Sequence, residues 1–127
     1  METAEQRGHH DLIAWQKAMD LVTAIYSTTQ KFPREELYGL TGQLRRAAVS
    51  VPGNLAEGYG RNSKNEFHYF IGLARGSLAE VETQVEIAMN LGYLDPEAYS
   101  RLFSRIDEVG RMLTGLRSWS AKVLPSS

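Results

Sequence analysis

One stretch of the sequence places five polar side chains at helical spacing around a proline. They step by four, four, three and four residues, and they are Arg46, Ser50, Asn54, Glu57 and Arg61. Residues three and four apart share one face of an α-helix, so this face can bind a polar ligand. A structural role explains the pattern equally simply, because Pro52 lacks a backbone donor and leaves the carbonyl of Ala48 without its usual partner. We favour local repair of this break by a short polar side chain, with Glu57 paired to Arg61.

The remaining chemistry-bearing residues do not form a catalytic or metal site. The chain has no cysteine, which excludes disulfides, thiolate ligands and cysteine nucleophiles. Di-iron helical bundles use Glu-x-x-His motifs, and the sequence contains none. His9 and His10 are adjacent in a polar segment, His68 is isolated, and Ser50 has no base nearby in the sequence. We therefore predict a protein that is not an enzyme and uses no metal and no cofactor.

The basic residues offer a surface for nucleic acid only as local clusters. The chain carries 14 Lys and Arg against 15 Asp and Glu, so its net charge of -1 gives no global attraction to phosphate. From residue 31 to 75 there are seven basic and four acidic residues, and from 99 to 122 there are five and two. Such charges often merely solvate an outward face. The candidate nucleic-acid-binding residues are the cations around the motif-rich second helical segment, namely Arg45, Arg46, Arg61, Lys64 and Arg75.

Four segments with an apolar residue every three or four positions must carry these groups. The pattern predicts helices near residues 12–31, 34–60, 63–91 and 95–122, separated by short breaks that contain Pro, Gly, Asn, Ser or Asp. The first helix is expected to begin after an Asp11 cap and to bury one stripe of side chains. This stripe comprises Leu12, Trp15, Met19, Val22, Tyr26 and Thr29.

The other helix boundaries carry specific signals. Pro52 falls inside the second pattern, where we expect a kinked helix because the apolar phase continues across the proline, with two shorter helices as the alternative. Ser63 to Glu66 reads as a capping box at the start of the third helix. Asp95 and Pro96 supply a cap and a first helical residue for the fourth.

Short connections favour antiparallel neighbours, so the predicted fold is an all-α, up-down-up-down four-helix bundle. At 127 residues, the chain fits a polar N-terminal arm over residues 1–10, one bundle domain over 11–123 and a C-terminal tail over 124–127. No apolar run is long enough to span a bilayer and the first residues are polar, so we expect a cytoplasmic protein that does not enter a membrane.

The helices carry more apolar surface than one bundle core needs, which indicates a homo-oligomer. Met112 and Trp119 lie at the edge of the fourth stripe, where they either cap the bundle or join an interface between subunits. Gly72 and Gly76 lie one turn apart on the third helix and permit close approach of another helix, from the same chain or from a neighbouring subunit.

Several blocks of the sequence resemble one family. In order, they are DLIAWQKAMDL, QKFPREELYGLTGQ, RRAAVSVPGNLAEGYGR and FIGLARGSLAEVETQ. They resemble the proteins encoded in intervening sequences of bacterial 23S ribosomal RNA, also called S23-type proteins, from about Asp11 to about Val123. The resemblance implies a four-helix bundle that assembles as a ring, with a homopentamer expected. The accessory protein of diversity-generating retroelements, similar in fold, is a basic pentamer that engages nucleic acid, and this chain departs from it in lacking a cationic surplus.

Two functions follow as hypotheses. In the first, a non-catalytic oligomer binds structured RNA through phosphates and shape, with the weak basic patch of each subunit repeated around the ring. In the second, the oligomer is a protein-interaction scaffold that binds no nucleic acid.

Overall fold

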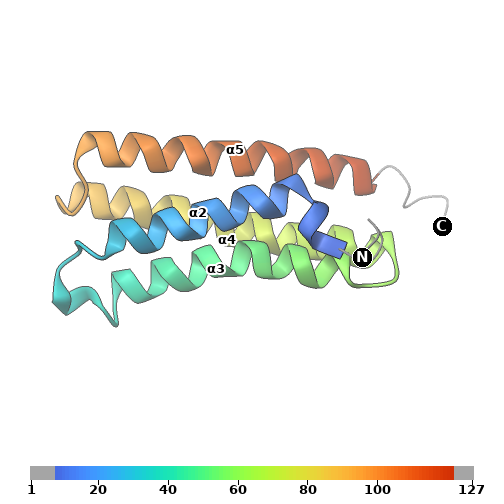
Figure 1. Ribbon diagram of the computed structural model, residues 1–127, viewed down its shortest axis with the longest axis horizontal. Helices are drawn as coiled ribbons and strands as arrows, with labels where there is room; N and C mark the ends of the chain where they lie inside the picture. The colour runs from blue at the N-terminus through green and yellow to red at the C-terminus, as the bar shows by residue number, and fades with distance from the viewer. Residues whose placement is uncertain (1–7, 122–127) are drawn as a thin grey trace, which may run out of the picture.

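The computed structural model describes residues 8–121, and the regular secondary structure of this part of the chain is all helical, without a β-strand (Figure 1). Its elements are η1 (Gly8–Asp11), α2 (Ile13–Thr29), η2 (Arg34–Glu36), α3 (Leu40–Tyr59), α4 (Lys64–Asn90) and α5 (Pro96–Ala121), where η marks a short 3-10 helix. The prediction of an all-α bundle of four long helices is confirmed.

The four long helices lie side by side along the length of the molecule (Figure 1). Each packs against two others, because α3 contacts α2 and α4 while α5 contacts α4 and α2. In Figure 1 the chain enters α3 and α5 at the end of the molecule where α2 and α4 finish. A single apolar core therefore fills the space between the four helices.

The core face predicted for the first helix is only partly confirmed. Thr29 is buried, and Leu12, Trp15 and Val22 pack against the core from partly buried positions. The buried residues of α2 are Ala14, Ala18, Leu21, Ile25 and Thr29. Met19 and Tyr26, both expected inside, are 40% and 41% exposed. The prediction followed the larger side chains, whereas the buried stripe runs through two alanines that let neighbouring helices approach closely. In α4 and α5 the predicted stripes are mostly buried, although Phe70, Tyr99 and Leu116 are only half-buried.

Two helix starts also differ from expectation. Asp11 does not cap α2, because it belongs to η1 and the cap residue is Leu12, which makes no side-chain cap bond. The rings of His9 and His10 contact Trp15 at centroid distances of 5.0 and 4.9 Å, and these contacts hold η1 against α2. The second predicted helix begins at Leu40, not near residue 34, because Gly39 adopts non-helical angles (φ -111°, ψ -115°).

The other boundary signals are confirmed. The hydroxyl of Ser63 accepts a hydrogen bond from the backbone N–H of Glu66 at 3.1 Å. The carboxylate of Asp95 accepts one from the N–H of Ala98 at 2.8 Å, and Pro96 is the first residue of α5. α3 continues through the buried Pro52 as one helix, so the alternative of two shorter helices is wrong.

α3 and α4 pack closely against each other at a buried glycine. A Cβ added to Gly58 would lie 2.5 Å from the Cβ of Phe70 and 3.2 Å from Cδ1 of Phe67, so only glycine fits there. Of the two glycines singled out in the third helix, Gly72 is covered by the side chain of Arg117, whereas Gly76 has no atom within 4 Å of a Cβ position. Gly76 is therefore open to a neighbouring molecule.

Candidate nucleic-acid interface

Arg45 is committed to the contact between α2 and α3. Its Nε donates a hydrogen bond to the hydroxyl of the buried Thr29 at 2.9 Å. Its guanidinium lies 4.7 Å from the centroid of the Tyr26 ring, within the range of a cation–π interaction. Arg45 thus stabilises the packing of two helices, and a phosphate would have to compete with both contacts.

Arg46 lies on the outer side of α3, one residue further around the helix. It borders a groove between α3 and α4 together with Gln43, Ser50, Glu80 and Gln84. The carboxylate of Glu80 on the same groove opposes the binding of an anion there. Arg46 is exposed, so it remains available to a ligand that reaches this face.

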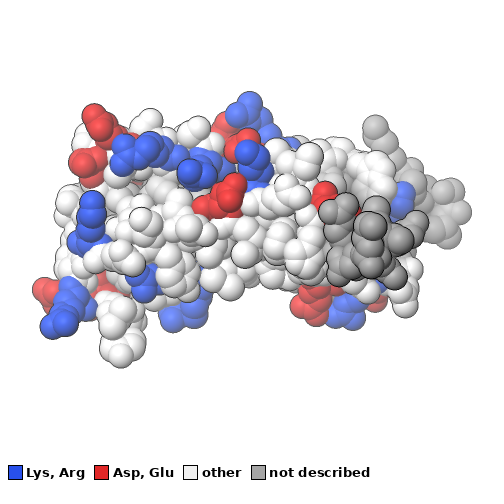
Figure 2. Space-filling model, in the orientation of Figure 1, with Lys and Arg blue, Asp and Glu red and all other residues white. Residues whose placement is uncertain are grey.

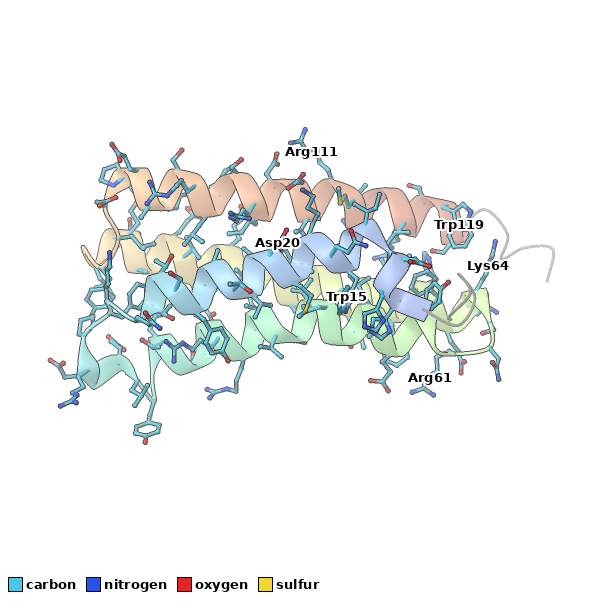
Figure 3. The ribbon with its side chains drawn as sticks, viewed as in Figure 1. Trp15, Asp20, Arg61, Lys64, Arg111 and Trp119 are labelled. Carbon is cyan, nitrogen blue, oxygen red and sulfur yellow. The ribbon has the colours of Figure 1, made fainter. Side chains whose placement is uncertain are left out.

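Arg61 and Lys64 lie against aromatic rings near the connection between α3 and α4. Arg61 pairs with Glu57 at 2.8 Å, as predicted, and its guanidinium lies 5.1 Å from the centroid of Phe70. The ammonium of Lys64 lies 3.8 Å from the centroid of Trp119. Figure 3 shows Lys64 and Trp119 at the same end of the bundle. Trp119 also contacts Phe67 edge-on at 6.4 Å, so it covers this end of the bundle although it is 47% exposed.

Arg75 lies on another side of the molecule. It borders a hollow between α4 and α5 that also contains Glu82, Asp107 and Arg111. Arg45 lies in α3 and Arg61 just past its end, and the 14 positions from Arg45 to Tyr59 already span about 21 Å at ~1.5 Å per residue. The five cations proposed from the sequence therefore face different sides of the bundle and do not form one patch on a single chain.

The polar residues around Pro52 form a small network that joins α3 to α4. The side-chain amide of Asn54 donates to the carbonyl of Ser50 at 2.8 Å and contacts its hydroxyl at 2.9 Å. That hydroxyl is 2.8 Å from the hydroxyl of Ser77 on α4. The predicted bond from a side chain to the backbone is confirmed, but it goes to Ser50 instead of the Ala48 carbonyl, because a side chain at position 54 reaches back one turn and no further.

A cationic groove between α2 and α5 was not identified from the sequence. Its cations are Lys31, which follows α2, and Arg101 and Arg105 of α5. Hydroxyl groups from Ser27, Thr28 and Ser104 line the same groove, and Asp95 is its acidic residue. The signal in the sequence was the excess of basic over acidic residues from 99 to 122. It could not be joined to Lys31 before the fold placed the end of α2 beside α5.

His68 is not isolated in the structure. Its Nδ1 lies 2.7 Å from the hydroxyl of Ser120, which is completely buried and donates to the carbonyl of Arg117 at 3.0 Å. The contact ties the end of α5 to α4. Among residues 8–121, no group of three or more His, Cys, Asp or Glu side chains is placed to hold a metal ion. None of the helices in the same range is long and apolar enough to cross a membrane.

The sequence matches the family described as 23S rRNA-intervening sequence protein over residues 10–115. This span includes most of all four long helices. The chain belongs to this family.

A crystal structure related to the family shares the fold. It is a protein of unknown function from the S23 ribosomal protein family of Bacteroides thetaiotaomicron VPI-5482. The two align with a TM-score of 0.78 at 18% identity, over 84% of this chain and 96% of the other. No curated protein sequence matches the chain. At this identity the likeness concerns the arrangement of the helices and not the function.

Proposed function

We propose that this protein is a non-catalytic homo-oligomer that binds structured RNA, with the bundles assembled as a ring, most simply of five subunits. The observation that carries the proposal is an apolar stripe on the outward side of α4. Its members are Tyr69, Leu73, Ile87 and the cap residue Leu91, which are 61%, 40%, 42% and 54% exposed. Exposed apolar side chains at both ends of one outward helix face, with Gly76 and Glu80 between them, favour association with another protein surface.

The groove between α3 and α4, which Gln84 lines, also favours association. The Oε1 atom of Gln84 is buried and has no hydrogen-bond partner within residues 8–121. A buried acceptor without a partner costs free energy, and a donor from a second subunit would remove that cost. Gly53 on α3 and Gly76 on α4 leave room for close approach, since nothing lies within 4 Å of either Cβ position. We call the outward side of α3 and α4 that contains these residues the α3–α4 face.

Measurement of the mass in solution tests assembly. Light scattering at micromolar concentration should return about five times the 14.2 kDa chain mass. Leu73→Glu should shift the mass toward the monomer without loss of helicity, because it places a charge in the apolar part of the interface. Met19→Glu on α2 is the matched control, since Met19 is equally exposed at 40%. A wild-type monomer, or equal effects of both variants, would refute this arrangement.

The RNA part of the proposal draws support from the family description and from symmetry. The matched family is described by its relation to 23S rRNA. A ring repeats every exposed cation once per subunit, so weak local fields add up for a ligand that spans several subunits. In a gel-shift assay with ribosomal RNA fragments, binding should be present at low salt and weaken steeply as salt rises. A stable ring that binds no RNA at low salt would leave the scaffold function in its place.

A further inference from the structure

The groove between α2 and α5 combines cations, hydroxyls and accessible space. It encloses about 650 Å³, and the three cations come from both sides, Lys31 from the end of α2 and Arg101 and Arg105 from α5. Basic side chains also gather over α5 and the end of α2 in Figure 2. We propose that this groove is where the protein binds the phosphate backbone of RNA, an inference that rests on the proposed RNA-binding function.

The lining of the groove carries three cations and one carboxylate, a balance of +2, and two further carboxylates lie close to it. Asp95 lines it, but one carboxylate oxygen is engaged by the N–H of Ala98 at the start of α5. Glu97 is 3.9 Å from Arg101, and the two side chains are 90% and 71% exposed, so water screens this pair strongly. Asp20 lies on α2 one turn before Ala24, at the rim of the groove (Figure 3). Among residues 8–121, neither Lys31 nor Arg105 forms an ion pair with any of these carboxylates, so both can pair with a ligand.

The exposure of the cations indicates a polymer and not a small anion. Lys31, Arg101 and Arg105 are all exposed, so a single phosphate held there would remain in water and gain little. A polyanion engages several such cations at once and releases the counterions condensed along its backbone. Arg101 and Arg105 are one helical turn apart, about 6 Å of rise, which is roughly two base steps of a nucleic-acid strand.

The hydroxyl groups make the groove suitable for RNA, because RNA presents a 2′-hydroxyl besides its phosphates. Ser27, Thr28 and Ser104 lie between the cations and can donate to phosphate oxygens or exchange hydrogen bonds with a ribose 2′-hydroxyl. Among the described residues that line the groove, the one aromatic side chain is Tyr93, which is half-buried and bonded to Glu36, so these residues offer no exposed stack of rings for unpaired bases. Its chemistry therefore fits backbone recognition of a structured RNA, with little dependence on base sequence.

A pair of matched double variants tests the groove. The probe is a labelled hairpin RNA with a fully paired stem, titrated at several salt concentrations. Arg101→Gln/Arg105→Gln should lower the magnitude of the salt slope of log K by about two, because each lost phosphate contact removes about one. Arg34→Gln/Arg111→Gln removes the same charge from exposed positions outside the groove and should change the slope much less.

The outcomes separate this inference from the function on which it rests. Wild-type protein that fails to bind the hairpin at low salt overturns both. Wild-type binding that both double variants weaken equally, or that neither weakens, overturns the groove and leaves RNA binding standing. The single variant Lys31→Gln should reduce the magnitude of the salt slope by about one. Competition by millimolar inorganic phosphate that matches competition by unlabelled hairpin would show a small-anion site and also overturn the proposal.

Discussion

At the scale of single residues, contacts within one helical turn could be predicted from the sequence, whereas contacts between helices could not. The pair of Glu57 and Arg61 and the Ser63 cap were predictable because both depend on neighbours within one helical turn. The role of Arg45 was not, since its partner Thr29 is 16 positions away on another helix. The same limitation hid the contact of His68 with Ser120. Side-chain partners on different helices can be identified only once the packing of the helices is known.

Gly58 provides a sharp test of close packing at one residue. Gly58→Ala would place a methyl group 2.5 Å from the Cβ of Phe70, so backbone must move between α3 and α4. We expect a loss of about 1–3 kcal/mol in the free energy of unfolding, measured by urea denaturation. This loss opposes the gain of ~1 kcal/mol that alanine normally brings in a helix.

Gly115→Ala on α5 is the matched control. Nothing lies within 4 Å of its Cβ position, and Gly115 is exposed and outside the α3–α4 face, so the substitution should stabilise the bundle by up to about 1 kcal/mol. If both variants change stability in the same direction by the same amount, the close crossing at Gly58 does not limit the packing.

At the scale of elements, the sequence predicted which segments form helices, but it predicted only in part which face of each helix is buried. The turns between helices carry strong local signals, such as Asp95 with Pro96, and these fixed the order of the elements. The stripe of α2 was misassigned because Ala14 and Ala18 are small enough to be core residues without standing out from the pattern. The five candidate cations were grouped by closeness in sequence, whereas grouping by helix face separates them and joins Lys31 to α5.

One side-chain hydrogen bond links the connection after α4 to the segment before α3. The hydroxyl of Tyr93 donates to Oε2 of Glu36 at 2.9 Å, while Oε1 of Glu36 accepts the backbone N–H of Leu40 at 3.1 Å. The hydrogen bond to Glu36 raises the pKa of Tyr93 above its ordinary value of 10, with burial and the nearby carboxylates acting in the same direction. Folding therefore favours the neutral phenol.

The hydrogen bond from Tyr93 to Glu36 should stabilise the fold by an amount that falls at alkaline pH. Because the folded pKa is raised, the contribution of Tyr93 is fully present below the unfolded pKa of 10 and is lost as pH rises through the folded pKa. Tyr93→Phe should thus be less stable than wild type at pH 8, and the difference should shrink above pH 10. Urea denaturation of both proteins across this range measures it. A difference that stays constant with pH would show that the hydroxyl acts only through packing.

At the scale of the whole molecule, assembly and RNA binding should be coupled through valency. The α3–α4 face and the groove between α2 and α5 lie on different helix pairs. In a ring each α3–α4 face meets a different surface of the next subunit, so every groove stays exposed when that surface is not the one between α2 and α5. A long RNA could then contact several grooves of one ring, and linked sites raise overall affinity by roughly 10²–10⁴ without any new contact. The variant Leu73→Glu, which we expect to be monomeric, should retain the groove and lose this gain.

The length of the RNA separates valency from damage to the groove. Leu73→Glu should bind a long structured RNA at least tenfold more weakly than the ring does, yet bind a short hairpin that reaches one groove with affinity close to that of wild type. Arg101→Gln/Arg105→Gln should weaken both probes, because it removes the contact itself. Fluorescence anisotropy with the two RNAs measures each case at fixed salt. Equal loss of affinity for the long and the short RNA in Leu73→Glu would contradict the coupling, since it would mean that the interface residue and the groove act on the same single contact.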